Sequence, residues 1–148
     1  MRFMMLMIPG NQVPDDKDPE KGAMPSDEDI AAMMTYNEAM VKAGVLLGAE
    51  GLHSSANGAR ITWSGGKPRV TDGPFAESKE VIGGFWMIRV NSKDEAIAWA
   101  KRCPVGDGVT IELRQVFEPE EFSPEVAKQE RALIEEIARG MDENQQRR

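Results

Sequence analysis

The chain has 148 residues, of which 41% are hydrophobic and 29% are charged. This length and composition fit one globular domain with a modest extension, and they argue against a fibrous or wholly disordered protein. The formal net charge is −7 and the basic residues do not cluster, so a nucleic-acid backbone would be repelled and nucleic-acid binding is disfavoured.

One cysteine, Cys103, and one histidine, His53, limit the chemistry available to a single copy. The lone cysteine excludes an internal disulfide and a thiolate metal cluster, and it fits a reducing cytoplasm. The lone histidine excludes a multi-histidine metal site within one copy. We therefore expect a cytoplasmic protein that uses neither a metal nor a cofactor.

The N-terminal apolar run at residues 3–8 predicts a strand in the middle of a sheet. It stops at Pro9-Gly10, which leaves it too short for a secretion signal or a membrane span, so we expect no membrane partner. Residues 9–25 hold four prolines, two glycines and a cluster of charge. This segment predicts a long mobile loop, a kind of segment that often serves as a lid.

The next segment, residues 27–43, predicts an amphipathic helix that ends near Gly44. Ser26 and Asp29 have the spacing of a capping box at its start. Its stripe, in which three of the residues are methionines, comprises Ile30, Met33, Met34, Asn37, Met40, Val41 and Gly44. Such a stripe could face a soft ligand, but methionines that fill a core face are the simpler interpretation.

Residues 45–52 predict a second strand, and residues 59–72 predict an inserted β-hairpin, because Gly65-Gly66 is a dipeptide that tight turns prefer. The period of two in a strand separates the side chains of the hairpin's first strand. Two apolar residues share one face and two polar residues share the other: Ile61 and Trp63 against Arg60 and Thr62.

Three further elements complete the predicted domain. Residues 85–90 predict a strand, residues 93–103 a helix that begins with Ser92 and Glu95 as a second capping box, and residues 110–117 the last strand. The inner face of this helix is expected to be small and apolar: Ala96, Ile97, Ala100 and Cys103.

Without the hairpin the element order is βαββαβ, which predicts an α+β fold of the ferredoxin-like type over residues 1–117. Helices would cover only one face of such a sheet, so we expect a homodimer that covers the other face. Residues 118–148 predict a C-terminal helix that must dock on its own subunit or on the partner. Its apolar side is Val126, Ala127, Leu133, Ile134, Ile137 and Met141.

The most specific motif is Asp72-Gly73-Pro74-Phe75, followed by Ala-Glu-Ser-Lys-Glu at 76–80 and by Gly83-Gly84 before an aromatic strand. With the opening strand, the Ala-Gly turn after the first helix and the closing Val-Thr-Ile-Glu-Leu-Arg at 109–114, the chain resembles the DGPF branch of the YCII-related family over residues 1–117.

The resemblance implies a dimeric α/β-barrel fold, in agreement with the element order. Members commonly sit near or fuse to sigma-factor genes, and the wider group is thought to use a His–Asp pair in a pocket beside the dimer interface. Asp72 matches the hallmark aspartate, whereas His53 follows the second strand and is not equated with the family's histidine.

Asp72 is a candidate catalytic residue because of its position before Pro74. An aspartate in a turn normally accepts from the backbone N–H two residues on, and proline has none. The carboxylate is therefore expected to bind the Phe75 N–H, a side chain or a ligand. Two interpretations stay open: Asp72 ties the turn to Lys79 or to a backbone amide, or it acts as a general acid–base group.

The other candidate site residues also have two interpretations each. His53 could be a general base or an ordinary turn residue. Arg60 and Arg114 could bind a carboxylate or phosphate with both guanidinium nitrogens, or form salt bridges with Glu112 or Glu80. Glu80 could border a substrate pocket or lie on a solvated turn.

Three functions are consistent with this pattern. The first is a cofactor-independent small-molecule enzyme, a lyase, isomerase or hydrolase, that acts through Asp72 and His53. The second is a non-catalytic ligand-binding or regulatory module associated with sigma-factor-type transcription regulation. The third is a purely structural dimer, and the fold alone does not choose between them.

Overall fold

The structure is a computed structural model that describes residues 1–10, 25–75 and 81–146. These residues form two units, Met1–Gln115 and Val116–Arg148, each of which is treated by itself. The loop predicted at 9–25 falls almost entirely outside the described residues.

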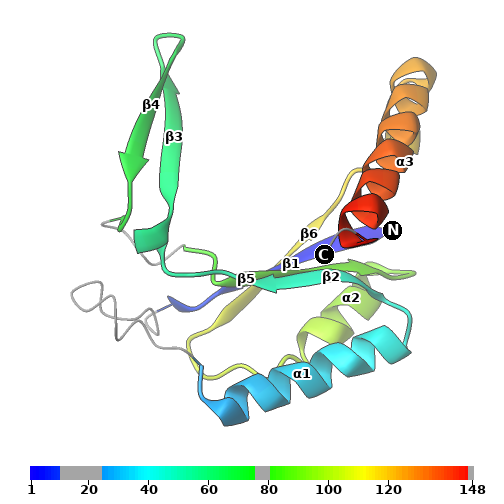
Figure 1. Ribbon diagram of the computed structural model, residues 1–148. Helices are drawn as coiled ribbons and strands as arrows, with labels where there is room; N and C mark the ends of the chain where they lie inside the picture. The colour runs from blue at the N-terminus through cyan, green and yellow to red at the C-terminus, as the bar shows by residue number, and fades with distance from the viewer. Residues whose placement is uncertain (11–24, 76–80, 147–148) are drawn as a thin grey trace. The chain divides into compact units, whose positions relative to one another are not determined.

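The first unit contains a four-stranded antiparallel sheet with the order β2-β5-β1-β6 (Figure 1). The strands are β1 (Arg2–Ile8), β2 (Leu46–Gly51), β5 (Gly84–Arg89) and β6 (Thr110–Gln115). The predicted strands are confirmed, and the chain has the predicted α+β composition. In the described residues the sheet is open, with β2 and β6 at its edges.

Two helices, α1 (Asp27–Lys42) and α2 (Lys93–Ala100), cover the same face of this sheet (Figure 1). The capping box predicted for α1 is confirmed, because Ser26 and Asp29 each accept the other's backbone N–H. At α2 only half of the predicted box is present. Ser92 accepts from the Glu95 N–H, whereas the Glu95 carboxylate accepts from the N–H of Asn91.

The core lies between the helices and the sheet. Its buried residues are Phe3, Met5, Tyr36, Met40, Val45, Trp86, Ile88, Val90, Ala96, Trp99 and Cys103. The Tyr36 hydroxyl donates to the Trp99 carbonyl at 2.8 Å, and Trp86 Nε1 donates to Asn37 Oδ1 at 2.8 Å. These bonds satisfy the polar atoms of large aromatic side chains within the core.

The predicted core stripe of α1 is partly wrong. Met40 is buried and Met33 packs against the core, but Ile30, Met34 and Val41 are exposed. Tyr36, which was not in the predicted stripe, is buried on the inner face of α1, where its ring contacts Trp86 and Trp99. The helix is therefore apolar over more than the single face that a sheet can cover.

The face of the sheet opposite α1 and α2 is also apolar at its centre. The register pairs Met4 with Met87 and Leu6 with Phe85, which places these four side chains on one face. All four are half-buried. The homodimer that was expected to cover this face remains a prediction.

The predicted hairpin is confirmed to the residue as β3 (Ala59–Ser64) and β4 (Lys67–Asp72). Among the described strands, β3 and β4 pair only with each other and form a separate two-stranded sheet, which we call the arm (Figure 1). Every residue of both strands is exposed. Gly65 and Gly66 adopt the positive φ angles that the tight turn requires.

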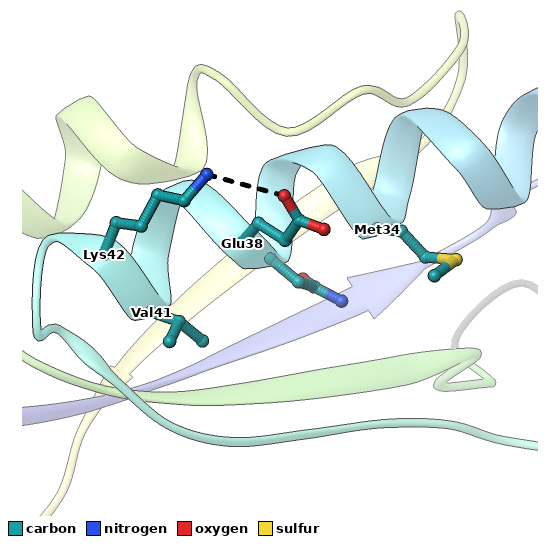
Figure 2. Close-up of a pocket in the computed structure, with 5 residues that line it drawn as sticks. Met34, Glu38, Val41 and Lys42 are labelled. Atoms are coloured by element: carbon teal, nitrogen blue, oxygen red, sulfur yellow. Dashed lines mark ion pairs between the residues drawn. The ribbon is translucent and has the colours of Figure 1, made fainter.

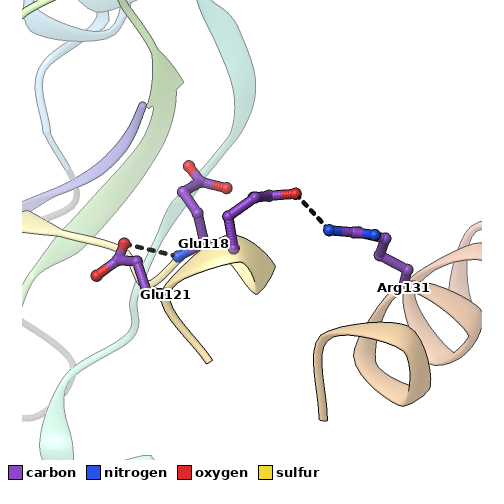
Figure 3. Close-up of polar contacts among 4 residues, drawn as sticks. Glu118, Glu121 and Arg131 are labelled. Carbon is purple, nitrogen blue, oxygen red and sulfur yellow. Dashed lines mark hydrogen bonds and ion pairs between the residues drawn. The ribbon is translucent and has the colours of Figure 1, made fainter. Parts of the chain in front are cut away.

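The second unit begins with a short 3-10 helix, Pro119–Glu121, and continues with α3 (Pro124–Gln146). The Glu118 N–H donates to the Glu121 carboxylate, and Arg131 pairs with Glu120 at 2.8 Å (Figure 3). On the apolar side of α3, Ala127 is buried, while the larger residues are exposed: Val126, Leu133, Ile134, Ile137 and Met141. None of the described helices is both long and apolar enough to cross a membrane.

Candidate functional site

The Asp-Gly-Pro-Phe motif lies where the arm ends. Asp72 is the last residue of β4, and the chain then passes the short 3-10 turn Ser55–Asn57 that precedes β3. The Gly73-Pro74 peptide bond is cis. The motif thus follows the last strand of the arm and lies next to the turn that precedes its first strand.

Gly73 has a structural role here. Its N–H donates to the Gly58 carbonyl at 2.9 Å. A Cβ at this position would collide with the Ser55 carbonyl oxygen, so no other residue fits without a shift of the backbone. Close approach of two backbone segments explains why the motif has glycine here.

Phe75 also has a structural role. Its N–H donates to Ser55 Oγ at 3.5 Å, and its ring lies under the Arg60 guanidinium at 4.0 Å from the centroid. A cation over an aromatic ring is attracted by the ring's quadrupole. Phe75 thus connects the motif both to the turn and to the first strand of the arm.

Asp72 differs from its neighbours. Its side chain is exposed and has no hydrogen bond or ion pair with any described residue. The Phe75 N–H, one of its expected partners, goes to Ser55 instead. Lys79, another expected partner, lies outside the described residues. Within the described parts of the chain, the Asp72 carboxylate therefore makes no polar interaction that would stabilise the fold.

The structure does not join the other candidates to Asp72. His53 is exposed, and no hydrogen bond or ion pair links it to a described residue. The register pairs Asp72 with Ala59 and Thr71 with Arg60, so Asp72 and Arg60 lie on opposite faces of the arm.

Arg114 lies on β6 and pairs with Glu112 at 3.2 Å, the salt bridge that was the alternative to substrate binding. The Arg114 side chain is 71% exposed and the Glu112 side chain 44% exposed, and an ion pair at the surface is weak enough to open for a ligand. Glu80 lies outside the described residues, so its role stays a prediction.

Sequence reasoning missed Ser55, which contacts the motif through both its carbonyl and its hydroxyl. The turn around Ser55 was predicted, but its contacts with Gly73 and Phe75 were not, because no local sequence pattern indicates a contact between residues about twenty positions apart. Among the described residues no group of three or more histidine, cysteine, aspartate or glutamate side chains could hold a metal ion. Burial raises the pKa of Cys103 to about 11, so its thiol is poorly reactive.

Comparison with known proteins gives two matches. The model of the YCII-related domain matches residues 1–120. An uncharacterised protein from Rhizobium meliloti (strain 1021) is 41% identical over 61 residues, which is 41% of this chain and 49% of that protein. The chain thus spans about half the length of this curated relative. Because the family model covers most of its length, the chain belongs to the YCII-related domain family.

Proposed function

We propose that this protein is a cofactor-independent enzyme that acts on a small molecule, with Asp72 as its acid–base residue. One observation carries the proposal: Gly73 and Phe75 hold the base of the arm together, whereas the Asp72 carboxylate makes no hydrogen bond or ion pair with a described residue. A charged group that the fold does not use is available to a ligand.

A carboxylate of this kind supports proton transfer in a lyase, an isomerase or a hydrolase. The Arg60 guanidinium lies over the Phe75 ring, on the face of the arm opposite Asp72, so Asp72 is the residue on which the proposal rests. In a single copy Asp72 is exposed, and efficient acid–base chemistry at neutral pH needs a covered carboxyl whose pKa is raised. The proposed site therefore needs a second surface.

We propose that a homodimer supplies this surface, in a ferredoxin-like arrangement of the dimeric α/β-barrel type. The strand order supports it, because β1 and β2 run parallel with β5 between them, as in a split βαβ unit. The apolar face formed by Met4, Leu6, Phe85 and Met87 supports it further, since a partner's sheet would bury that face.

A non-catalytic ligand-binding module is the second candidate. It is favoured by the absence of any hydrogen bond or ion pair between Asp72 and His53 in the described residues. A binding protein needs one group that recognises the ligand, whereas acid–base catalysis usually needs a second group to orient or accept the proton.

A thermal-shift screen of metabolites against wild type and Asp72→Asn tests the site. We expect at least one compound to raise the melting temperature of the wild type and not that of Asp72→Asn, because the substitution removes the charge and keeps the shape. Asp142→Asn makes the same chemical change at an exposed position of α3 and should behave as the wild type. Equal shifts in all three proteins would show that Asp72 does not bind the ligand.

The same compound separates the two candidates. Incubation of the ligand with the wild type, followed by proton NMR, should show conversion to product for the enzyme and an unchanged spectrum for the module. If conversion occurs at equal rates with wild type and Asp72→Asn, the acid–base role of Asp72 is wrong.

A further inference from the structure

Three arginines share one end of the sheet face opposite α1 and α2. The register pairs Arg2 of β1 with Arg89 of β5. It also pairs Met4, two residues along β1 from Arg2, with Arg114 of β6. Alternate residues of a strand point to the same face, so the three arginines and Met4 lie on one face. We call Arg2, Arg89 and Arg114 the arginine cluster. Its members are far apart in the sequence, and only the paired strands bring them together.

The charges of this cluster are not balanced within its own end of the sheet. Like charges that lie directly opposite one another on neighbouring strands destabilise a sheet, and Arg2 and Arg89 are such a pair. The acids that the register places on the same face, Glu50 and Glu112, lie nearer the other end of the strands. The local field at the arginine cluster is therefore positive, although the chain as a whole carries a net charge of −7.

The arginine cluster has hydrogen-bond donors available to a ligand. The Arg89 side chain is exposed and forms no hydrogen bond or ion pair with a described residue. Arg114 donates one hydrogen bond, from Nη1 to Glu112 Oε1 at 3.2 Å. A guanidinium has five N–H groups, so Arg114 keeps donors for a second acceptor. From Arg2 the cluster needs only its charge and its place opposite Arg89.

The surface next to the arginine cluster is apolar. Met4 and Met87 pair across β1 and β5 on the same face, and both are half-buried. Methionine side chains adapt to apolar groups of irregular shape. Arg2 is the first residue of β1 and Arg89 is the last residue of β5, so the cluster lies at the edge of the area that the proposed homodimer would cover. A ligand can therefore reach the arginines from the end of the strands and lay an apolar part over the methionines.

The hollow along the outer side of α1 lacks this excess of charge. It measures about 310 Å³ and is lined by Met34, Asn37, Glu38, Val41 and Lys42 (Figure 2). Lys42 and Glu38 form an ion pair at 3.6 Å, so the charges that line the hollow cancel. Of these two surfaces, the arginine cluster is the one whose chemistry selects an anion.

We infer that the arginine cluster binds the phosphate or carboxylate group of a small molecule whose apolar part lies on Met4 and Met87. Guanidinium groups bind such oxyanions through two N–H groups at once. An anion between Arg2 and Arg89 would also offset the repulsion between them. The inference adds a site to the one proposed at Asp72 and requires neither Asp72 nor the homodimer, so its failure would leave both of those proposals standing.

Titration of the full chain with n-hexyl phosphate, hexanoate and inorganic phosphate tests the site, followed by two-dimensional NMR of the arginine Nε–H groups. We expect a hexyl compound to shift the resonances of Arg89 and Arg114 and to bind about tenfold more tightly than inorganic phosphate, because its chain buries apolar surface. Arg89→Gln should weaken the binding of this compound at least about tenfold. Arg69→Gln, which removes an exposed arginine of the arm, is the matched control and should bind as the wild type does.

Three results of this titration would overturn the inference. If no probe binds the wild type, there is no anion site. If Arg89→Gln binds the probes as tightly as Arg69→Gln does, the bound anion is not held by the arginine cluster. If inorganic phosphate binds as tightly as both hexyl compounds, the methionines do not contact the ligand and the proposed ligand class is wrong.

Thermal unfolding without a ligand separates a binding site from a structural contact. Arg89→Gln removes one of two like charges that face each other, so its melting temperature should equal that of the wild type or exceed it by up to about 3 °C. A fall of several degrees would show that Arg89 stabilises the protein through a contact of its own and would overturn the site. Sedimentation equilibrium should give the same oligomeric state for Arg89→Gln and the wild type. Dissociation of the variant alone would assign Arg89 to a contact between copies and not to a ligand.

Discussion

Gly73 is the residue of the motif that tolerates replacement least. We predict that Gly73→Ala destabilises the base of the arm by about 1–3 kcal/mol, because the new Cβ meets the Ser55 carbonyl and forces the backbone apart. Gly58→Ala is the matched control, since its Cβ would lie 3.6 Å from the same oxygen in an extended backbone. Amide hydrogen exchange across β3 and β4 measures the difference. Equal protection in the two variants would show that the close approach is not needed.

The buried side chains of Cys103 and Tyr36 should make the free energy of unfolding depend on pH in the alkaline range. Burial raises the pKa of Cys103 from 9.0 to about 11 and raises the pKa of Tyr36 above its usual 10.0. Above these usual values the unfolded chain loses protons that the folded chain keeps, so the stabilisation is complete below pH 9 and is lost as pH rises. We expect the free energy of unfolding to fall by about 1 kcal/mol between pH 9 and pH 10 through the Cys103 thiol, and more steeply above pH 10, where the Tyr36 hydroxyl adds its own loss.

Urea unfolding at a series of pH values measures this slope. Cys103→Ala should flatten the fall between about pH 9 and 10, and Tyr36→Phe should reduce it above about 10. Tyr36 is the single tyrosine of the chain, so its ionisation can also be followed directly by ultraviolet absorbance. Titration of the folded protein at the usual tyrosine pKa would contradict the burial argument.

At the scale of elements, the sequence predicts those helix and strand boundaries that depend on neighbouring residues. The boundaries of β3 and β4 follow from Gly65-Gly66 and from the alternation beside it, and the start of α1 follows from Ser26 and Asp29. The burial of a helix face depends on what packs against it, which no local pattern contains. Two residues show this most clearly. Met34 of α1 was predicted in the core stripe and is exposed, whereas Trp99 of α2 was left out of the predicted inner face and is buried.

The candidate site divides in the same way. Asp72 was found from the four-residue motif in which it stands. The contacts of Ser55 with Gly73 and Phe75 could not be found from the sequence, because these residues are far apart in the chain and meet only in the folded structure. The motif thus singled out Asp72 as a candidate, and the structure gives contacts at the base of the arm to Gly73 and Phe75 but no hydrogen bond or ion pair to the Asp72 carboxylate.

At the scale of the whole molecule, the two units predict how the chain can be divided. All residues of the buried core cluster, and the partly buried ones that pack on it, lie between Phe3 and Leu113 in the first unit. The second unit has contacts of its own, such as the tilted ring pair of Phe117 and Phe122. The core cluster of the first unit therefore contains no residue of the C-terminal helix.

We predict that a chain ending at Phe117 folds, because every residue of this core cluster is kept when residues 118–148 are removed. Its two-dimensional NMR spectrum should keep the dispersed resonances of Trp86 and Trp99, and its free energy of unfolding should stay within about 1 kcal/mol of the full chain. As a control, Ile88→Ala removes a fully buried side chain and should cost about 2–5 kcal/mol in either length of chain. A collapsed or unfolded product of the truncation would mean that the apolar side of α3, with Leu133 and Ile137, supplies cover that the first unit requires.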